Sequence, residues 1–425
     1  MIDINLIREK PDLVKQNLKK KFQEEKIKLI DEAIKLDEDW REIKQKVDNL
    51  RAERNKLSQE INKLKKSGKN ADNVLKKVKG IPAKIEKAEE KAKKYKQKLS
   101  EILLNIPNII HKTVPIGKDA TENVEIEKIG KPTKFAFTPK NHIEIGEALG
   151  MLDFDTSAEV SGKGFYYLKK DIALLNMALV NFARDFMVKK GYEYVEPPLM
   201  IREHVLSGVY SHAEIEQMSY NIADEDLYLI ATSEHPMIGM FINKVINKNE
   251  LPIKITGYSM CFRKEIGSHG IEEKGLFRTH QFNKQEMIVI CEPEDSYKYY
   301  EEMSTLSVQI FKKLGIPTRR LECCSGDLGD LKAKSEDLEA WSPVKKEYYE
   351  VGSLTNMEEA QARRLNIRIT DGKERYFAHT LNNTVIATSR ALVAILENFQ
   401  NKDGSVDIPK ALHPYTGFKK IKAKK

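Results

Sequence analysis

The sequence is poor in cysteine and lacks any long apolar run. Its four cysteines, Cys261, Cys291, Cys323 and Cys324, show no C-x-x-C spacing. This pattern argues against a disulfide framework and against a cysteine-based zinc site, and it fits a reducing compartment. No apolar run approaches the length of a membrane span, and the charged N-terminus lacks the apolar core of a signal peptide. We therefore expect a cytoplasmic protein with no membrane contact.

Two glycine-rich nucleotide-binding patterns are missing as well. The chain has neither a G-x-x-x-x-G-K-[ST] loop nor the Rossmann fingerprint G-x-G-x-x-G. Any nucleotide must therefore be held by arginines and strands. With 425 residues, the chain is long enough for two or three domains and a large core.

Positive charge is concentrated near the N-terminus. Residues 41–100 carry 20 Lys and Arg against 8 Asp and Glu, an excess of twelve positive charges. Because the whole chain is at +8, the remainder has a net charge of −4. A basic block on a slightly acidic protein is typical of an appendage that binds nucleic acid.

The same region has the apolar periodicity of a coiled coil. Two short helices are expected in residues 1–25, with Pro11 in a first turn, and a long helix from about Ile27. Turn residues at 67–70 separate two heptad runs of similar length, which predicts an antiparallel hairpin of helices, each roughly 50 Å or more long. Gly80 and Pro82 predict a kink or restart in the second helix. The a/d positions are occupied by Trp40, Ile43, Val47, Leu50, Leu57, Ile61 and Leu64, then by Val74, Val78, Ile81, Ile85, Ala88, Ala92, Tyr95, Leu99 and Ile102.

This hairpin has two interpretations. It is either a lysine-rich solvated coiled coil or a clamp that neutralises the phosphates of a nucleic acid. It has no evident base-reading element, so a clamp would recognise shape more than sequence. Residues 105–140, rich in Pro, Gly and Asn, are predicted to be a linker. We expect a coiled-coil arm at 1–110 and a second domain at 111–425.

Residues 261–290 have the pattern of a long-looped antiparallel hairpin. Apolar-edged strands are expected around Tyr258–Phe262 and Phe282–Ile290, with a loop containing Gly267, Gly270 and Gly275 between them. Arg263, Lys264 and Glu265 end the first strand, and Arg278, His280 and Glu286 belong to the second. Arginine forks suit phosphate or carboxylate, and Phe282 shares a face with Lys284 and Glu286. A solvated hairpin with surface salt bridges is the alternative.

Three further stretches place polar side chains on or beside predicted elements. Thr232 and Glu234 follow the predicted strand 227–231, where they could bind a ligand ammonium, although the local sequence by itself favours a helix cap. Glu350 and Ser353 on a predicted strand offer hard oxygen ligands that suit Mg²⁺. Arg390 begins an apolar helix, a position suited to a phosphate, but an ordinary capped core helix has the same pattern.

These stretches together resemble the class II aminoacyl-tRNA synthetases. The segment Phe-Arg-Lys-Glu with His-Gln-Phe-Asn-Lys-Gln-Glu at 262–286 resembles motif 2, and in its details it is similar to seryl-tRNA synthetases. The helix 172–190 followed by the strand and prolines at 192–198 resembles motif 1, and the run into Arg390 resembles motif 3. The Asn-Asn-Thr at 382–384 departs from the Asn-Gly-Ser common in bacterial members and resembles archaeal or eukaryotic ones. The resemblance covers nearly the whole chain in the family's order.

The resemblance implies an α+β fold, with an antiparallel sheet flanked by helices, an N-terminal antiparallel coiled-coil hairpin, and a homodimer. It also implies that serine is activated by ATP with Mg²⁺ and transferred to the 3′ end of tRNA(Ser), with tRNA(Sec) a further candidate, and that the arm grips the tRNA. In that reading the catalytic residues are Arg263 and Arg390. The serine-binding residues are Thr232, Glu234, Arg263, Arg278, Glu286 and Thr384. The ATP-binding residues are Arg263, Lys264, Glu265, Thr279, Phe282, Glu350, Val351, Gly352, Ser353 and Arg390, and the metal ligands are Glu350 and Ser353.

Two other functions remain open from the sequence. One is a class II ligase that loads an amino acid onto a carrier protein, but such relatives lack the long arm. The other is a non-catalytic tRNA-binding paralogue, which should have lost a motif arginine, whereas Arg263 and Arg390 are both present.

Overall fold

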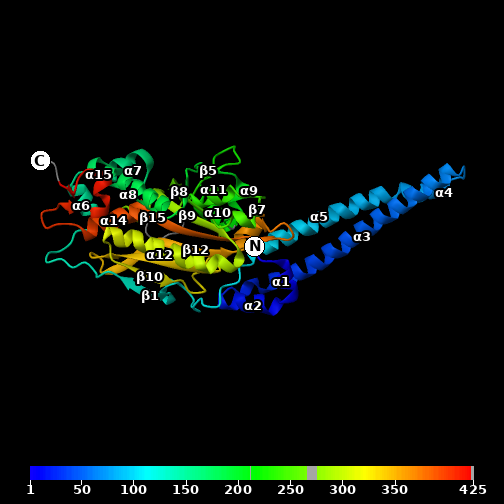
Figure 1. Ribbon diagram of the computed structural model, residues 1–425, viewed down its shortest axis with the longest axis horizontal. Coiled ribbons are helices and arrows are strands. Elements are labelled where there is room, and N and C mark those ends of the chain that lie inside the picture. The colour runs from blue at the N-terminus through cyan, green and yellow to red at the C-terminus, as the bar shows by residue number, and fades with distance from the viewer. Residues whose placement is uncertain (211, 266–274, 423–425) are drawn as a thin grey trace. The chain divides into compact units, whose positions relative to one another are not determined.

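The computed structural model describes residues 1–210, 212–265 and 275–422 (Figure 1). Its chain divides into two compact units, Met1–Ile109 and Ile110–Lys425. Within the described residues, no helix is both long enough and apolar enough to cross a membrane. All four cysteines are free and buried.

The first unit is entirely helical. Its elements are α1 (Ile4–Glu9), α2 (Pro11–Lys20), the 3₁₀ turn η1 (Glu24–Lys26), α3 (Ile27–Lys66), α4 (Asp72–Lys79) and α5 (Ile81–Asn105). Pro11 occupies the first turn of α2, as predicted. With 40 residues, α3 is roughly 60 Å long at 1.5 Å per residue. The predicted restart is confirmed, because Gly80 separates α4 from α5, whose first turn contains a proline.

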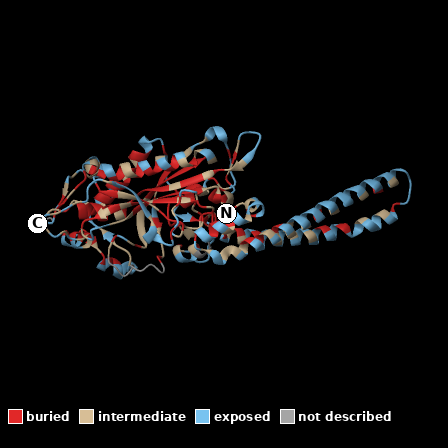
Figure 2. Ribbon diagram, turned by 90° about the horizontal axis from the view of Figure 1, so that it is seen from below, coloured by how far each residue is buried: buried red, intermediate tan, exposed pale blue. Residues whose placement is uncertain are grey.

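The predicted seam of the helical hairpin is confirmed. Val47 of α3 packs with Ile81 and Ile85 of α5, and Leu50, Leu57 and Ala88 join this cluster. In residues 41–100 every buried residue is apolar and every charged residue is exposed. Exposed residues dominate the ribbon of the two long helices (Figure 2). Arg51 of α3 and Glu89 of α5 form an ion pair across the hairpin at 2.6 Å. A narrow apolar contact and charged outer faces therefore define this arm.

A second apolar cluster closes the base of the same unit. Ile7, Val14 and Leu18 from the two short helices pack with Ile30 and Leu99 of the long ones. The short helices thus cover the end of the hairpin that carries both chain connections. This base cluster is separate from the seam cluster farther along the arm.

The second unit is built on an eight-stranded sheet with the order β1-β10-β11-β12-β15-β9-β8-β4. Neighbouring strands are antiparallel except for β4 and β8, which are parallel. The strands of this sheet are β1 (Val124–Ile129), β4 (Glu193–Val195), β8 (Ile253–Phe262), β9 (Gln281–Cys291), β10 (Thr318–Glu322), β11 (Lys334–Ser342), β12 (Glu347–Glu358) and β15 (His379–Ala387). The predicted α+β class, with an antiparallel sheet and helices around it, is confirmed.

Shorter strands and helices surround this sheet. The small strands are β2 (Leu152–Asp153), β3 (Tyr167–Leu168), β5 (Met200–Ile201), β6 (Tyr228–Leu229), β7 (Val245–Asn247), β13 (Arg368–Thr370), β14 (Arg375–Phe377), β16 (Val406–Asp407) and β17 (Lys420–Ile421). The helices are α6 (His142–Ala148), α7 (Asp155–Ser161), α8 (Lys170–Lys189), α9 (Glu203–Leu206), α10 (His212–Met218), α11 (Glu234–Gly239), α12 (Ser296–Leu314), α13 (Ala360–Leu365), α14 (Thr388–Asn398) and α15 (His413–Thr416), with 3₁₀ turns at Ala120–Glu122, Lys248–Glu250, Pro293–Asp295 and Lys410–Leu412.

Each face of the sheet has its own apolar core, and β9 contributes to both. Met287 and Val289 point into the larger core, which α8, α12 and α14 cover, while Ile288 and Ile290 point into a smaller core that includes α11 and α13. Alternate residues of a strand face opposite sides, so the second half of β9, which is buried on both faces, is apolar from Met287 to Cys291. β9 is therefore a central strand, which fixes the position of the functional hairpin in the sheet.

Two sequence expectations need correction. The stretch 105–140 is more than a linker, because β1 lies within it and forms an edge of the main sheet through its pairing with β10. The strand predicted at 227–231 is reduced to β6, and α11 begins at Glu234 soon after it.

The helix expected at 172–190 is observed as α8, and Gly191 follows it with φ +84°, the left-handed conformation that favours glycine as a helix stop.

Candidate functional site

The β8–β9 hairpin supplies the floor of the site. The two strands pair antiparallel in an unbroken register from Ile253 with Ile290 to Phe262 with Gln281. Arg263 directly follows β8, and Arg278 and His280 lie just before β9 instead of on it. The hairpin itself is confirmed, whereas Gly267 and Gly270 of its loop lie outside the described residues. The period-two face is observed too: Phe282, Lys284 and Glu286 all line cavities on one side of the sheet.

The first cavity, of about 240 Å³, is framed by two arginines that lie over aromatic rings. The guanidinium of Arg263 lies 5.1 Å from the ring centroid of Phe282, and that of Arg390 lies 5.0 Å from the centroid of Phe277. Stacking of this kind holds a guanidinium in place without using its hydrogen-bond donors. The cavity is lined by Met218, Arg263, Glu265, Phe277, Arg278, Thr279, Phe282, Lys284, Glu350, Val351, Gly352, Thr384, Ala387, Ser389 and Arg390.

Arg390 and Glu350 form the link between α14 and β12. Arg390, in the first turn of α14, donates from Nη1 to the backbone oxygen of Glu350 at 2.9 Å and lies 3.2 Å from the Glu350 carboxylate. Burial raises the pKa of Glu350, but the charge of Arg390 and its hydrogen bond outweigh burial, so this pKa lies below its ordinary value. The carboxylate is therefore ionised and available to a cation at neutral pH.

Arg278 belongs to this cavity and not to the group around Thr232. It donates to the carboxylate of the buried Glu265 at 2.7 Å, and Glu265 has the left-handed backbone conformation, with φ +53°. Lys264 turns the other way and donates to the backbone oxygen of Glu216 at 3.3 Å. The structure thus brings Arg278 together with Phe282 and Arg390, apart from most of the residues with which the resemblance grouped it.

The second cavity, of about 360 Å³, adjoins the first and shares Arg263, Lys284, Glu350 and Thr384 with it. The two together fall in the usual range for ligand pockets, about 300–1,000 Å³. The other residues that line the second cavity are Val209, Tyr210, Glu214, Thr232, Glu234, His235, Glu286, Cys323, Asp327, Gly329, Asp330, Leu331, Lys332, Asp337, Ser353, Thr355, Met357 and Asn382.

Glu286 is the central polar group of the second cavity. One of its oxygens, Oε1, accepts a hydrogen bond from Thr232 Oγ1 at 3.0 Å and pairs with Lys284 Nζ. The other oxygen, Oε2, is buried and has no hydrogen-bond partner among the residues that the structure describes. Because an unpaired buried oxygen costs free energy, this atom is suited to a ligand hydroxyl or N–H.

Glu234 adds a second carboxyl whose ionisation depends on its surroundings. The Glu234 carboxyl accepts a hydrogen bond from Gln361 Nε2 at 3.1 Å. The backbone N–H of Glu234 donates a second one to Thr232 Oγ1 at 3.3 Å. The N-cap residue of α11 is Ser233, which makes no side-chain cap hydrogen bond, so the hydroxyl of Thr232 links the start of α11 to Glu286 without being the helix cap. Burial, followed by the negative charge of Glu286, raises the pKa of Glu234 to about 7. A ligand ammonium would favour its ionised form.

A bulge in β12 turns Glu350 and Ser353 toward the same cavity. Residues three apart on a regular strand face opposite sides, but the register shifts between Leu338–Gly352 and Glu339–Glu350, so Val351 is the extra residue. Ser353 pairs across the sheet with Asp337 and donates a hydrogen bond to its carboxyl group. Burial and the charge of Glu350 raise the pKa of Asp337 to about 7. The oxygens of Glu350, Ser353 and Asp337 therefore border one space.

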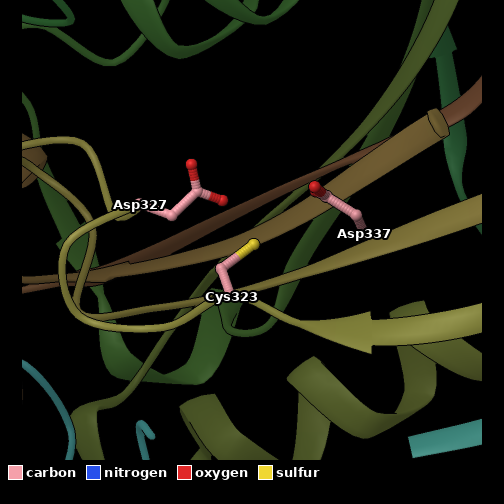
Figure 3. A group of neighbouring side chains, drawn as sticks. All are labelled: Cys323, Asp327 and Asp337. Atoms are coloured by element: carbon pink, nitrogen blue, oxygen red, sulfur yellow. The ribbon is translucent and has the colours of Figure 1, made fainter. Parts of the chain in front are cut away.

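Asp337 also belongs to a second group of potential metal ligands. The ligand atoms of Cys323, Asp327 and Asp337 all lie within 4.8 Å of one another (Figure 3). The prediction of no cysteine-based zinc site rests on the absence of paired cysteines. The fold instead places a single thiol beside two carboxyls, which cysteine spacing does not indicate. A mixed sulfur and oxygen set suits Zn²⁺ better than Mg²⁺, whereas Glu350 and Ser353 offer oxygen alone.

The site includes residues beyond those predicted from the sequence. Lys284 could have been included, because it alternates with Phe282 and Glu286 on the same face of β9. Asp337 could not, because its position depends on the pairing of β11 with the bulged β12. His235 follows Glu234, and burial lowers its pKa to about 3, so its ring is neutral at the cavity wall.

Comparison with known proteins accounts for both units. Residues 1–110 match the family model described as the seryl-tRNA synthetase N-terminal domain. Residues 217–399 match the model described as the tRNA synthetase class II core domain (G, H, P, S and T). The two models therefore cover the arm and all residues that line the first cavity, and most of those that line the second.

Whole-chain relatives agree with these matches. The chain is 43% identical to the serine–tRNA ligase of Methanospirillum hungatei over 99% of its own length and 100% of that protein. It superposes on the crystal structure of seryl-tRNA synthetase from Pyrococcus horikoshii complexed with ATP with a TM-score of 0.94 and 43% identity over 100% of both chains. The serine–tRNA ligase from Naegleria fowleri in complex with AMP matches with a TM-score of 0.89 and 35% identity, covering 100% of this chain and 99% of that one. With the motif order, the arm and the catalytic fold in agreement, the chain belongs to the seryl-tRNA synthetase family of aminoacyl-tRNA ligases.

Proposed function

We propose that the two adjoining cavities activate L-serine with ATP and that the seryl group is then transferred to the 3′ end of tRNA(Ser). The observation that carries the choice of serine is Glu286, whose buried Oε2 has no partner among the described residues and whose Oε1 is already held by Thr232 and Lys284. A serine hydroxyl would satisfy Oε2. Glu234 would accept the serine ammonium, and Thr384, which lines both cavities, would border the amino acid on its other side.

The first cavity takes the nucleotide. Phe282 would stack on the adenine, and Glu265 would accept from its exocyclic amine. Arg263 lies where the two cavities join and would hold the α-phosphate, while Arg390 would hold the γ-phosphate. We assign Arg278 to the phosphate side, because it lines this cavity beside Glu265. Lys264, Thr279, Val351 and Gly352 complete the surroundings of the nucleotide. The similarity to a relative crystallised with ATP supports the nucleotide assignment.

The donor set in β12 fits a magnesium ion. Glu350 is ionised beside Arg390, and the bulge turns Ser353 to the same space, so both offer hard oxygen ligands. When bound, Mg²⁺ would neutralise phosphate charge. The residues of the chain orient the reactants: a serine carboxylate oxygen forms a bond to the α-phosphorus, and the bond from that phosphorus to the bridging oxygen of pyrophosphate breaks. A ribose hydroxyl oxygen of the tRNA then forms a bond to the seryl carbonyl carbon, the bond from that carbon to the phosphate oxygen breaks, and AMP leaves with the hydroxyl proton. Chemistry of this kind relies on positioning and charge neutralisation.

The arm is proposed as the tRNA-binding element, 1–110, and residues 111–425 as the catalytic domain. Its support is the exposed excess of Lys and Arg between residues 41 and 100, which suits a phosphate backbone. A homodimer, charging of tRNA(Sec) and a cytoplasmic location stay predictions from the family resemblance and from the sequence.

The decisive experiment is ATP–pyrophosphate exchange with each amino acid in turn. Serine should support exchange, and alanine should be at least about a thousandfold worse, because alanine leaves the Glu286 oxygen unpaired. Threonine tests the space around the hydroxyl. No exchange with serine, or equal exchange with threonine, would contradict the assignment.

A second experiment tests the metal ligands. Glu350→Ala should strongly depress exchange at every Mg²⁺ concentration while tRNA binding stays near normal, and Glu347→Ala on the same strand, which lines neither cavity, is the matched control. A parallel loss of tRNA binding would mean that Glu350 is structural.

A further inference from the structure

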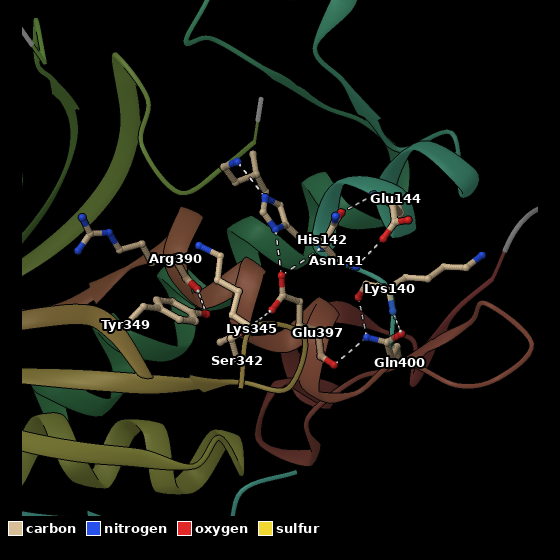
Figure 4. A network of polar contacts seen from close by, with 12 residues as sticks. Lys140, Asn141, His142, Glu144, Ser342, Lys345, Tyr349, Arg390, Glu397 and Gln400 are labelled. Carbon is tan, nitrogen blue, oxygen red and sulfur yellow. Dashed lines mark hydrogen bonds and ion pairs between the residues drawn. The ribbon is translucent and has the colours of Figure 1, made fainter. Parts of the chain in front are cut away.

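A buried histidine outside both cavities connects three segments of the catalytic unit. His142 is the first residue of α6, and its ring Nδ1 lies 3.1 Å from Oε1 of Glu397 on α14 (Figure 4). Its Nε2 lies 3.2 Å from the backbone nitrogen of Leu276, in the segment that returns from the motif 2 loop to β9. Neither His142 nor Glu397 lines the nucleotide cavity, so the proposed mechanism assigns neither a role.

The partners of the ring determine its tautomer. The backbone N–H of Leu276 can only donate, so Nε2 must be the accepting nitrogen. The proton of the neutral ring is then on Nδ1, which donates to the Glu397 carboxylate. The other oxygen of Glu397 accepts from Ser342 Oγ at 2.7 Å. Glu397 thus holds the ring in the one form that can accept from Leu276.

The ring itself is held in a fixed position. The backbone of Lys140, two residues earlier, exchanges two hydrogen bonds with the side chain of Gln400, at 2.8 and 2.9 Å. The backbone N–H of His142 also donates to Glu397 Oε1 at 3.3 Å. On the other side, a Cβ added to Gly275 would lie 2.8 Å from His142 Nε2, so only glycine lets the backbone approach the ring this closely.

The anchored segment leads directly to the nucleotide cavity. Leu276 is fully buried, and the next residue, Phe277, lies under the guanidinium of Arg390 and edge-on to Tyr349 at 5.4 Å. Arg390 and Glu397 are seven residues apart on α14, close to two helical turns, so they share a face of the helix. One face of α14 therefore holds the γ-phosphate arginine at one end and the carboxylate that orients His142 at the other.

We propose that His142, oriented by Glu397, is a positioning residue for ATP: by accepting from the backbone N–H of Leu276 it sets the place of Phe277, and Phe277 sets the place of Arg390. The proposal rests on the assignment of the first cavity to the nucleotide. It concerns ATP alone, because Thr232, Glu234 and Glu286 have no contact with this connection.

Two amide variants separate the two contacts of the ring. In His142→Asn the short side chain reaches Glu397 in place of Nδ1 but cannot reach Leu276, whereas in His142→Gln the longer one can offer its oxygen to the Leu276 N–H. The proposal expects the KM for ATP in pyrophosphate exchange to rise by about tenfold or more in the Asn variant, since a buried donor loses its acceptor. The Gln variant should stay within about threefold of the wild type, and the KM for serine should change little in either.

Two further measurements make the outcome decisive. Calorimetric titration with ATP in the absence of serine should show the same order of affinities, and hydrogen exchange at the Leu276 amide should accelerate in the Asn variant alone. His379→Ala is the control, because His379 is a half-buried histidine of the same unit whose Nδ1 lies 3.0 Å from Ser296 Oγ, and it lines neither cavity.

The proposal is rejected if ATP affinity is unchanged in the Asn variant, if the KM values for ATP and serine rise together, or if neither amide variant folds. Because the titration needs no serine, these results are distinguishable from a failure of the proposed function, which would appear as a wild-type protein without serine-dependent exchange.

Discussion

The arm and the catalytic unit use charge in opposite ways. In residues 41–100 the buried side chains are all apolar, and the lysines and arginines are in contact with solvent. In the catalytic unit, Glu234, Glu265 and Glu286 are each less than a tenth exposed, and each has a specific partner. A solvated charge costs little to keep and can be exchanged for another, whereas a buried charge persists only where its partners are fixed.

This difference shows which feature of each region is under constraint. In the arm the constraint is the apolar seam, and the total charge on its faces matters more than any one lysine. In the catalytic unit the constraint is the position of single atoms, such as Glu286 Oε2 and the guanidinium of Arg390. Removing one charge should therefore have a large effect in the catalytic unit and a small one in the arm.

The largest effect is expected from removal of Arg263, a half-buried arginine that lines both cavities. Arg263→Ala should lower serine-dependent exchange by about a hundred- to a thousandfold, the usual cost of losing one charged donor to a reacting group. Affinity for tRNA should stay within about twofold, since the proposed contacts with tRNA are on the arm. Arg54→Ala, which removes an exposed arginine of α3, is the matched control and should leave exchange unchanged. If both variants lost a similar amount of exchange activity, the proposed difference between the catalytic unit and the arm would be wrong.

Deletion of the outer arm should have the next largest effect, and on tRNA alone. Replacing residues 41–95 with a short Gly-Ser linker removes the seam cluster but keeps the base cluster with Ile30, Leu99 and Leu103. Affinity for tRNA(Ser) should fall by about ten- to a hundredfold, and the dependence of log K on log salt should become less steep, because fewer phosphates are neutralised. Exchange should stay within about twofold of the intact protein.

A salt titration of tRNA binding, run beside the exchange assay, distinguishes the outcomes. An unchanged slope would mean that the lysines are only a solvated surface and that tRNA is held elsewhere. Loss of exchange together with the arm would mean that the catalytic fold requires it.

A smaller effect is expected from titration of Glu234. Its pKa is raised from about 4.5 to about 7, so the carboxyl is protonated below pH 7 and cannot pair with the serine ammonium. The KM for serine should therefore rise by up to about tenfold per unit as pH falls below 7. The sign for stability is opposite: the folded state binds this proton more tightly than the unfolded state, so the contribution to stability is full below pH 4.5 and is lost as pH rises through 7. Glu234→Gln should flatten both profiles.

The contrast between the arm and the catalytic unit also explains which features could be predicted from the sequence. The seam residues follow a heptad and the β8–β9 hairpin follows a period of two, and both patterns are local, so the sequence predicts them correctly. The bulge at Val351 is not encoded by a period. This bulge nevertheless turns the side chains of Glu350 and Ser353 to the same side of β12. The sequence indicates that the two residues act together only because both offer oxygen ligands.

The remaining site residues depend on contacts far apart in the chain. Asp337 joins the site through its pairing with Ser353 across two strands, and His142 reaches Leu276 over 134 positions. Arg278 lines the first cavity, where it forms an ion pair with Glu265 beside the hairpin loop, and the sequence does not indicate which way its side chain turns. These contacts join residues far apart in the chain, so no local sequence pattern can predict them.

The smallest effect is expected from the ion pair of Arg51 and Glu89, whose side chains are 54% and 45% exposed. Glu89→Gln should change the free energy of unfolding by less than about 1 kcal/mol, because solvent screens an exposed pair and two long side chains lose freedom in forming it. Thermal unfolding of the full chain, followed by circular dichroism at low and high salt, measures this change, and Val47→Ala in the buried seam is the comparison. The valine variant should cost more, because it removes buried methyl groups and its effect does not depend on salt. If Glu89→Gln is the more destabilising of the two, charge pairing and not the apolar seam stabilises the arm. The claim that single charges matter in the catalytic unit but not in the arm would then be wrong.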